Sequence, residues 1–151
     1  MESAKLAPMG MLRFNHMELT LPAGSLSNEG RADIKAFYGE VFDFEALDVP
    51  IFDQLGLLLR TDEATSQFLL LMESDRPIDS PGYDHLGFLY DTRDEVDERL
   101  EQVRRWQDKD DRVRIKEYED LVTGSTTVHA FYVRHLLPIW FDIQCIEHTS
   151  V

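Results

Sequence analysis

Hydrophobic residues recur along the first half of the chain in two kinds of pattern. In residues 31–44 the apolar side chains are spaced at i, i+3, i+4, i+7 and i+8, which predicts an amphipathic helix with one buried stripe. Short apolar or alternating runs, which are typical of strands, lie at 12–21, 44–50, 54–60 and 66–73. This half therefore predicts the order β-α-β-β-β.

The second half repeats that order after residues 74–82, a segment whose two prolines and glycine interrupt the pattern. A strand is predicted at 83–91, followed by a helix at 92–106 that opens with a capping box from Thr92 to Glu95. Three more strands are predicted at 112–121, 126–135 and 139–147. Because each open sheet has an apolar face that needs a partner, the repeat predicts an α+β fold whose two modules share one core.

Length and composition restrict the protein's class. The 151 residues, 43% of them hydrophobic, suit one domain spanning 1–151, with modules at about 12–74 and 82–148. The net charge of −14 repels phosphates and anionic lipids, so we expect neither nucleic-acid nor membrane partners. The lone Cys145 excludes an internal disulfide, and its apolar strand predicts a buried thiol in a reducing, cytoplasmic protein.

Two histidines occupy matching positions in the first strand of each module, His16 and His85. A single strand histidine is more often structural, but two at equivalent points of duplicated modules can converge on a shared axis. Neutral imidazole is the commonest metal ligand, and a carboxylate often accompanies it. On the last strand Asp142 and Gln144 share a face, so either could complete a metal site.

Two further side chains are candidates for acid–base chemistry. Glu18 lies on the same strand face as His16 and could take a proton from a bound substrate, although a solvent-facing role is slightly the more plausible. His129 could line the same cavity as an acid or base, but a hydrogen-bonded strand histidine is the commoner case. His135, at a predicted turn, and His148, near the end of the chain, are expected to be exposed.

The order of elements, with FYGEVFDFE in the first module and GYDHLGF opening the second, resembles the vicinal oxygen chelate superfamily of glyoxalases, bleomycin-resistance proteins and dioxygenases. The resemblance covers residues 12–147. It implies that the two modules form an incomplete barrel with helices packed outside, and that homodimers are possible. His16 and His85 match the first-strand positions at which many members of this superfamily bind a divalent metal.

The sequence departs from the family pattern at two places. Leu70 stands where the family often has a glutamate on the fourth strand. On the last strand, an alignment without gaps places Asp142 at the position of the family's glutamate, whereas an alignment on Pro138 places Gln144 there. With Asp142 the site would hold two histidines and a carboxylate, as in iron dioxygenases; with Gln144 it would bind a metal more weakly.

The resemblance implies a small enzyme that uses iron, manganese, zinc or nickel on a small molecule with adjacent oxygens, as a dioxygenase, isomerase or lyase. The alternative is a small-molecule binding protein without catalysis, similar to the bleomycin-resistance proteins, whose aromatic, acid-rich crevice takes cationic ligands. The net charge fits this alternative. The second matched histidine favours the enzyme, because a metal-free binder needs no imidazole at both positions.

Overall fold

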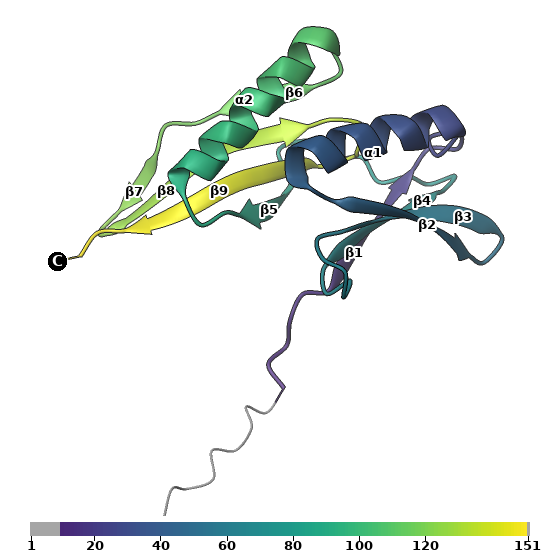
Figure 1. The fold of residues 1–151 in the computed structure, drawn as a ribbon, viewed down its shortest axis with the longest axis horizontal. Helices are drawn as coiled ribbons and strands as arrows, with labels where there is room; N and C mark the ends of the chain where they lie inside the picture. The colour runs from purple at the N-terminus through teal and green to yellow at the C-terminus, as the bar shows by residue number, and fades with distance from the viewer. Residues whose placement is uncertain (1–9, 151) are drawn as a thin grey trace, which may run out of the picture.

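The first half of the chain folds into a four-stranded sheet with one helix. The computed structural model describes residues 10–150 (Figure 1). The elements of this module are β1 (His16–Leu21), α1 (Asn28–Phe42), β2 (Glu45–Ile51), β3 (Gln54–Arg60) and β4 (Phe68–Glu73). The strand order is β1-β4-β3-β2, with β1 parallel to β4 and the other pairs antiparallel.

The second half forms a five-stranded sheet with the equivalent order. Its elements are β5 (His85–Leu89), α2 (Arg93–Lys109), β6 (Arg114–Glu117), β7 (Leu121–Thr123), β8 (Thr126–Arg134) and β9 (Trp140–His148). The order is β5-β9-β8-β6, and β7 pairs with β8. The predicted α+β fold of two βαβββ modules is confirmed, and within residues 10–150 the two sheets remain separate and close no barrel.

Two predicted strands differ from the observed ones. The strand predicted at 12–21 begins only at His16, because its partner β4 begins at Phe68, which pairs with His16. The strand predicted at 112–121 is interrupted at 118–120, so β6 and β7 each pair separately with β8. Neither helix of the described chain has the length and apolar character needed to cross a membrane.

Local sequence signals explain where the helices begin. Ser27 precedes α1, and its hydroxyl accepts a hydrogen bond from the backbone N–H of Gly30 at 3.1 Å. Thr92 does the same for Glu95 at 3.2 Å, which confirms the predicted start of α2. Asp43 ends α1 in a left-handed conformation with φ of 57°, so the chain turns sharply into β2.

The two modules share one hydrophobic core, in which α1 is the central element. Phe37 and Tyr38 of α1 are fully buried, and α1 contacts α2 of the second module (Figure 1). The Tyr38 ring lies 5.8 Å from that of Phe141 on β9. The Tyr38 hydroxyl donates a hydrogen bond to the backbone carbonyl of His135 at 2.6 Å, which links the modules by a buried polar contact.

The expectation that His135 is exposed is wrong. Only 2% of the residue is accessible, because its ring packs 4.6 Å from that of Phe37. Burial lowers the pKa of His135, an effect that nearby Asp110 opposes in part. His148 is exposed and Cys145 is buried, as predicted.

Replacing Tyr38 by phenylalanine should lower the free energy of unfolding by about 1 kcal/mol, the usual net value of one hydrogen bond. The lost hydrogen bond joins the two modules, so denaturant unfolding of Tyr38→Phe measures how much that bond contributes to stability. Tyr118→Phe is the matched control, because Tyr118 is 42% exposed and its hydroxyl has no hydrogen bond within residues 10–150. Equal stability of the two variants would contradict the prediction.

Candidate functional site

The sheet of the second module has one face packed on the core, and within residues 10–150 no helix lies on its other face. Helix α2 packs against β6, β8 and β9, and on that side of β9 Phe141 and Ile143 are fully buried. Side chains alternate along a strand, so Trp140, Asp142 and Gln144 point to the opposite face. We call the opposite face of this sheet the open face; its central strands are β9 and β8.

Asp142 and His85 meet on the open face. Strands β5 and β9 are parallel neighbours, with Gly87 in register with Asp142, and His85 Nε2 lies 3.7 Å from Asp142 Oδ2. Asp142 is 8% exposed, and its Oδ1 atom has no hydrogen-bond partner among the described residues. Burial raises the pKa of Asp142, an effect that His85 opposes only when its ring is protonated.

The surroundings of His85 determine which ring nitrogen can act as a ligand. His85 Nδ1 lies 2.8 Å from the backbone carbonyl of Tyr83. A carbonyl only accepts, so we assign the ring proton to Nδ1, which leaves the lone pair on Nε2. Nε2 and the carboxylate oxygen of Asp142 are then two acceptors facing each other, an arrangement that a proton or a bound cation between them would stabilise.

Tyr132 completes this group from β8. It is in register with Asp142, and its hydroxyl oxygen lies 3.4 Å from His85 Nε2. Burial, followed by the charge of Asp142, raises the pKa of Tyr132, so its hydroxyl stays protonated near neutral pH and can donate a hydrogen bond. Sequence analysis missed Tyr132, although its position opposite Asp142 across the hairpin is a signal that could have identified it.

The candidate residues of the first module lie elsewhere. The His16 ring is exposed and stacks on Phe68 at 4.7 Å, with Nδ1 2.8 Å from Asn15 Oδ1. Glu18 is exposed and in register with Leu70. Within residues 10–150 of one chain, no three His, Cys, Asp or Glu side chains are grouped so that they could hold a metal.

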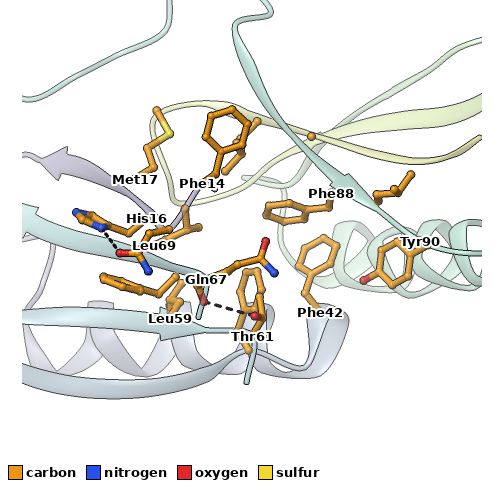
Figure 2. A pocket seen from close by; sticks show the side chains of 16 residues that line it. Phe14, His16, Met17, Phe42, Leu59, Thr61, Gln67, Leu69, Phe88 and Tyr90 are labelled. Carbon is orange, nitrogen blue, oxygen red and sulfur yellow. Dashed lines mark hydrogen bonds between the residues drawn. The ribbon is translucent and has the colours of Figure 1, made fainter. Parts of the chain in front are cut away.

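A cavity of about 740 Å³ lies between the modules and is lined by residues of both, including some from the edge strands β1 and β5 (Figure 2). His16 borders it, whereas His85 and Asp142 are not among its lining residues. Figure 2 shows apolar side chains from both modules pointing into it. Its aromatic lining consists of Phe14, Phe42, Phe44, Phe68, Phe88 and Tyr90.

His129 belongs to a separate cluster at the α2 side of the sheet. Its Nδ1 lies 2.7 Å from Asp120 and its Nε2 lies 2.6 Å from Asp97 on α2. Arg93 also binds Asp120, at 2.7 Å, and reaches Glu147 at 2.5 Å. The two carboxylates bind opposite nitrogens of the ring, so the imidazole bridges them and is held apart from the pair formed by His85 and Asp142.

Comparison with known structures identifies the fold. FosX, the fosfomycin resistance protein of Listeria monocytogenes, matches with a TM-score of 0.62 at 17% identity over 90% of this chain and 94% of that one. A possible glyoxalase from Bacillus cereus matches with a TM-score of 0.59 at 16% identity, covering 89% and 100%. A virulence protein of Salmonella typhimurium gives 0.58 at 20% identity, covering 91% and 98%.

These similarities confirm the glyoxalase-like fold that the resemblance in sequence implies. At such low identities they establish the architecture alone. A FosX mutant with a TM-score of 0.59, 15% identical over 94% of this chain and 95% of that one, was solved with Mn(II) and 1S,2S-dihydroxypropylphosphonic acid. No protein-family model matches the sequence, and the search of curated proteins found no match.

The His129 cluster predicts a loss of stability as the pH rises. Burial and the nearby Arg93 guanidinium lower the pKa of His129, but hydrogen bonds to Asp97 and Asp120 outweigh them and raise it overall. Because the folded pKa exceeds the unfolded value of about 6.5, the ion pairs stabilise fully below that pH and are lost as the pH rises through the folded pKa. The free energy of unfolding of the wild type should exceed that of His129→Gln at pH 6. Denaturant unfolding between pH 6 and 9 should show this difference shrink by about 1 kcal/mol.

The matched control for this measurement is His148→Gln. His148 is exposed at the end of the same sheet and forms no ion pair with a carboxylate within the described chain. Its replacement should leave the pH dependence of unfolding as it is in the wild type. A constant difference between wild type and His129→Gln over the whole pH range would exclude the bridging imidazolium.

Proposed function

We propose that this chain is a small enzyme of the vicinal oxygen chelate type, which uses a divalent metal to act on a small molecule with adjacent oxygens. The observation that carries the proposal is the approach of His85 Nε2 to Asp142 Oδ2, 3.7 Å apart on neighbouring strands. Both atoms are acceptors in the assigned tautomer, and the second carboxylate oxygen of Asp142 lacks a partner within residues 10–150. A nitrogen and a carboxylate oxygen without protons suit iron, manganese, zinc or nickel.

Asp142 is the preferred carboxylate ligand in this proposal. Its carboxylate lies 3.7 Å from His85. Gln144 is in register with Leu89, four residues beyond His85 on β5. A carboxylate also supplies the negative charge that a divalent cation requires, which an amide does not. Gln144 remains the alternative ligand, to be tested beside Asp142.

The third ligand, His16, reaches the site from a second copy of the chain in this proposal. Within one chain it is not grouped with His85 and Asp142. Strands β1 and β5, which carry the two histidines, are both sheet edges with one paired side each. On the uncovered face of the first sheet, half-buried apolar side chains such as Leu58 and Leu70 would suit contact with another copy. The protein is therefore proposed to act as a homodimer.

The side chains near the metal ligands divide the chemistry between them. A divalent cation held by His85 and Asp142 would supply a Lewis acid for negative charge on two adjacent substrate oxygens. Tyr132, whose raised pKa keeps its hydroxyl protonated, donates a hydrogen bond to a substrate oxygen. Glu18, two residues beyond His16 on the same strand face, takes a proton from the substrate. His129 is left out, because carboxylates already occupy both of its ring nitrogens.

A second candidate function is the binding of a small apolar molecule without catalysis. The observation that favours it is the cavity of about 740 Å³ between the modules, a volume that suits a drug-sized ligand. Its lining is mainly aromatic and aliphatic, with Asn15, Thr61 and Gln67 among the polar residues. This cavity and the pair formed by His85 and Asp142 are different places, so the two functions can be tested independently.

Elemental analysis tests the metal site directly. Protein purified without chelator or a metal-binding tag should contain about one iron, manganese, zinc or nickel ion per chain. The variants His16→Ala, His85→Ala and Asp142→Asn should each bind that metal at least about tenfold more weakly. Gln144→Ala is the matched control on the same strand face, and it should retain the metal. Retention in Asp142→Asn with loss in Gln144→Ala would assign the carboxylate position to Gln144 instead.

Mixing two deficient variants tests whether the site is shared between copies. In a dimer of His16→Ala with His85→Ala, one of the two sites contains His16 and His85 from different chains and is intact. Random exchange should therefore restore roughly a quarter of the wild-type metal content. No recovery after unfolding and refolding the mixture together would place both histidines of a site in the same chain.

The binding function predicts affinity that survives metal removal. The neutral fluorescent probe N-phenyl-1-naphthylamine should bind in the cavity with the same affinity before and after chelator treatment, because no metal ligand except His16 borders it. Leu89→Glu places a charge in the lining at a 66% exposed position and should weaken binding at least about tenfold. Leu121→Glu, at an equally exposed strand residue outside the lining, is the control.

A further inference from the structure

An aromatic cluster surrounds the candidate ligands on the open face. The Tyr132 ring lies 4.7 Å from that of His85, 4.8 Å from Tyr118 and 6.4 Å from Tyr83. Tyr83 also lies 5.1 Å from Trp140. The exposed fractions of Tyr83 and Tyr118 are 49% and 42%, so both rings are accessible to a ligand. Within the described chain, helix α2 packs on the opposite side of this sheet, and these rings do not belong to the hydrophobic core.

A lysine lies among these rings. Lys116 Nζ is 4.8 Å from the ring centroid of Tyr83 and 5.3 Å from that of Tyr118. Lys116 forms no ion pair with a carboxylate among the described residues, although the whole chain has 29 acidic and 15 basic residues. An ammonium group held by aromatic faces alone keeps its capacity to bind an anion.

The sheet register places this cation at a defined distance from the metal ligands. Lys116 on β6 is in register with Tyr132 on β8, which is in register with Asp142 on β9. Neighbouring strands are about 4.8 Å apart, so the backbones of Lys116 and Asp142 lie roughly 10 Å apart across the row. That length accommodates one six-membered ring with a substituent at each end. Gly87 ends the row and adds no side chain above Asp142.

We propose that the open face binds an aromatic carboxylate. The ring stacks among Tyr83, Tyr118 and Tyr132, and the carboxylate pairs with Lys116. The opposite edge of the ring points to His85 and Asp142. This inference names the substrate class of the proposed enzyme, and it rests on the proposed function only in taking the open face as the substrate site.

Charge fixes the direction in which such a ligand binds. The carboxylate of Asp142 repels an anionic group and therefore excludes the ligand's carboxylate from that end of the row. Lys116 attracts it at the other end of the row. Arg114, 5.0 Å above the Trp140 ring and unpaired with any described carboxylate, adds a second positive charge to the open face. The neutral or phenolic oxygens of the ligand then face His85.

Calorimetric titration of chelator-treated protein with 4-hydroxybenzoate tests the inference without a metal. The ligand should bind with 1:1 stoichiometry. The uncharged 4-hydroxybenzyl alcohol and the non-aromatic cyclohexanecarboxylate should each bind at least about tenfold more weakly, since one lacks the charge and the other the π-face. Equal affinity for either analogue, or no saturable binding of 4-hydroxybenzoate, would overturn the proposal.

Variants of Lys116 assign the anion site. Lys116→Met retains the length of the side chain and removes the charge, so it should weaken 4-hydroxybenzoate about tenfold or more, while Lys116→Arg should stay within about threefold of wild type. Lys109→Met is the matched control, because Lys109 lies 4.0 Å above the Trp106 ring on α2, away from the open face. An unchanged affinity in Lys116→Met would contradict the assignment.

The two proposals fail separately. If 4-hydroxybenzoate binds as expected but the purified protein takes up no metal, the aromatic acid site stands and the enzymatic function falls. If metal binds through His85 and Asp142 but the titration detects no 4-hydroxybenzoate, the metal site stands and the aromatic carboxylate is excluded as its ligand.

Discussion

Aromatic packing between α1 and the second module holds the two halves of this protein together. The sheets share no hydrogen-bonded strand pair among the described residues, so side-chain packing from α1 and the residues after it supplies the contact. Phe42 of α1 lies 5.5 Å from Phe88 on β5, and Tyr38 lies 5.8 Å from Phe141 on β9, which itself stacks on Phe88 at 4.8 Å. Rings of this size bury much apolar area and also restrict geometry, so they fix the orientation of one module relative to the other.

This packing decides which surfaces remain available for chemistry. The inner face of the second sheet packs against α2 and the shared core. Its polar residues Asp142 and Tyr132 therefore lie on the open face. The first sheet likewise leaves His16 and Glu18 exposed. A core that joins the modules through their helices therefore separates the two matched histidines within one chain.

Much of this architecture could be predicted from the sequence. The stripe in 31–44 and the capping box at Thr92 located both helices, because amphipathic period and capping are local properties. The start of β1 and the break at 118–120 could not be predicted, since strand ends depend on where a partner strand begins. The burial of His135 was missed for the same reason: its ring is covered by Phe37, almost a hundred residues earlier in the chain.

The candidate site shows the same division. Period-two alternation correctly placed Asp142 and Gln144 on one face, but alternation alone cannot say which of them meets His85. The choice depends on the parallel register of β5 and β9, which is anchored where the Trp140 backbone N–H donates to the Asp84 carbonyl at 3.2 Å. Leu136, with a φ of 63°, lies in the turn that leads the chain into this register.

The same hairpin also brings Tyr132 opposite Asp142. A shift of β9 by one residue would turn Asp142 into the core and expose Phe141, at the cost of the aromatic packing that joins the modules. The hydrophobic contact between the modules thus fixes the polar row across the open face. The position of a carboxylate beside His85 follows from the need to bury Phe141 on the other side of the strand.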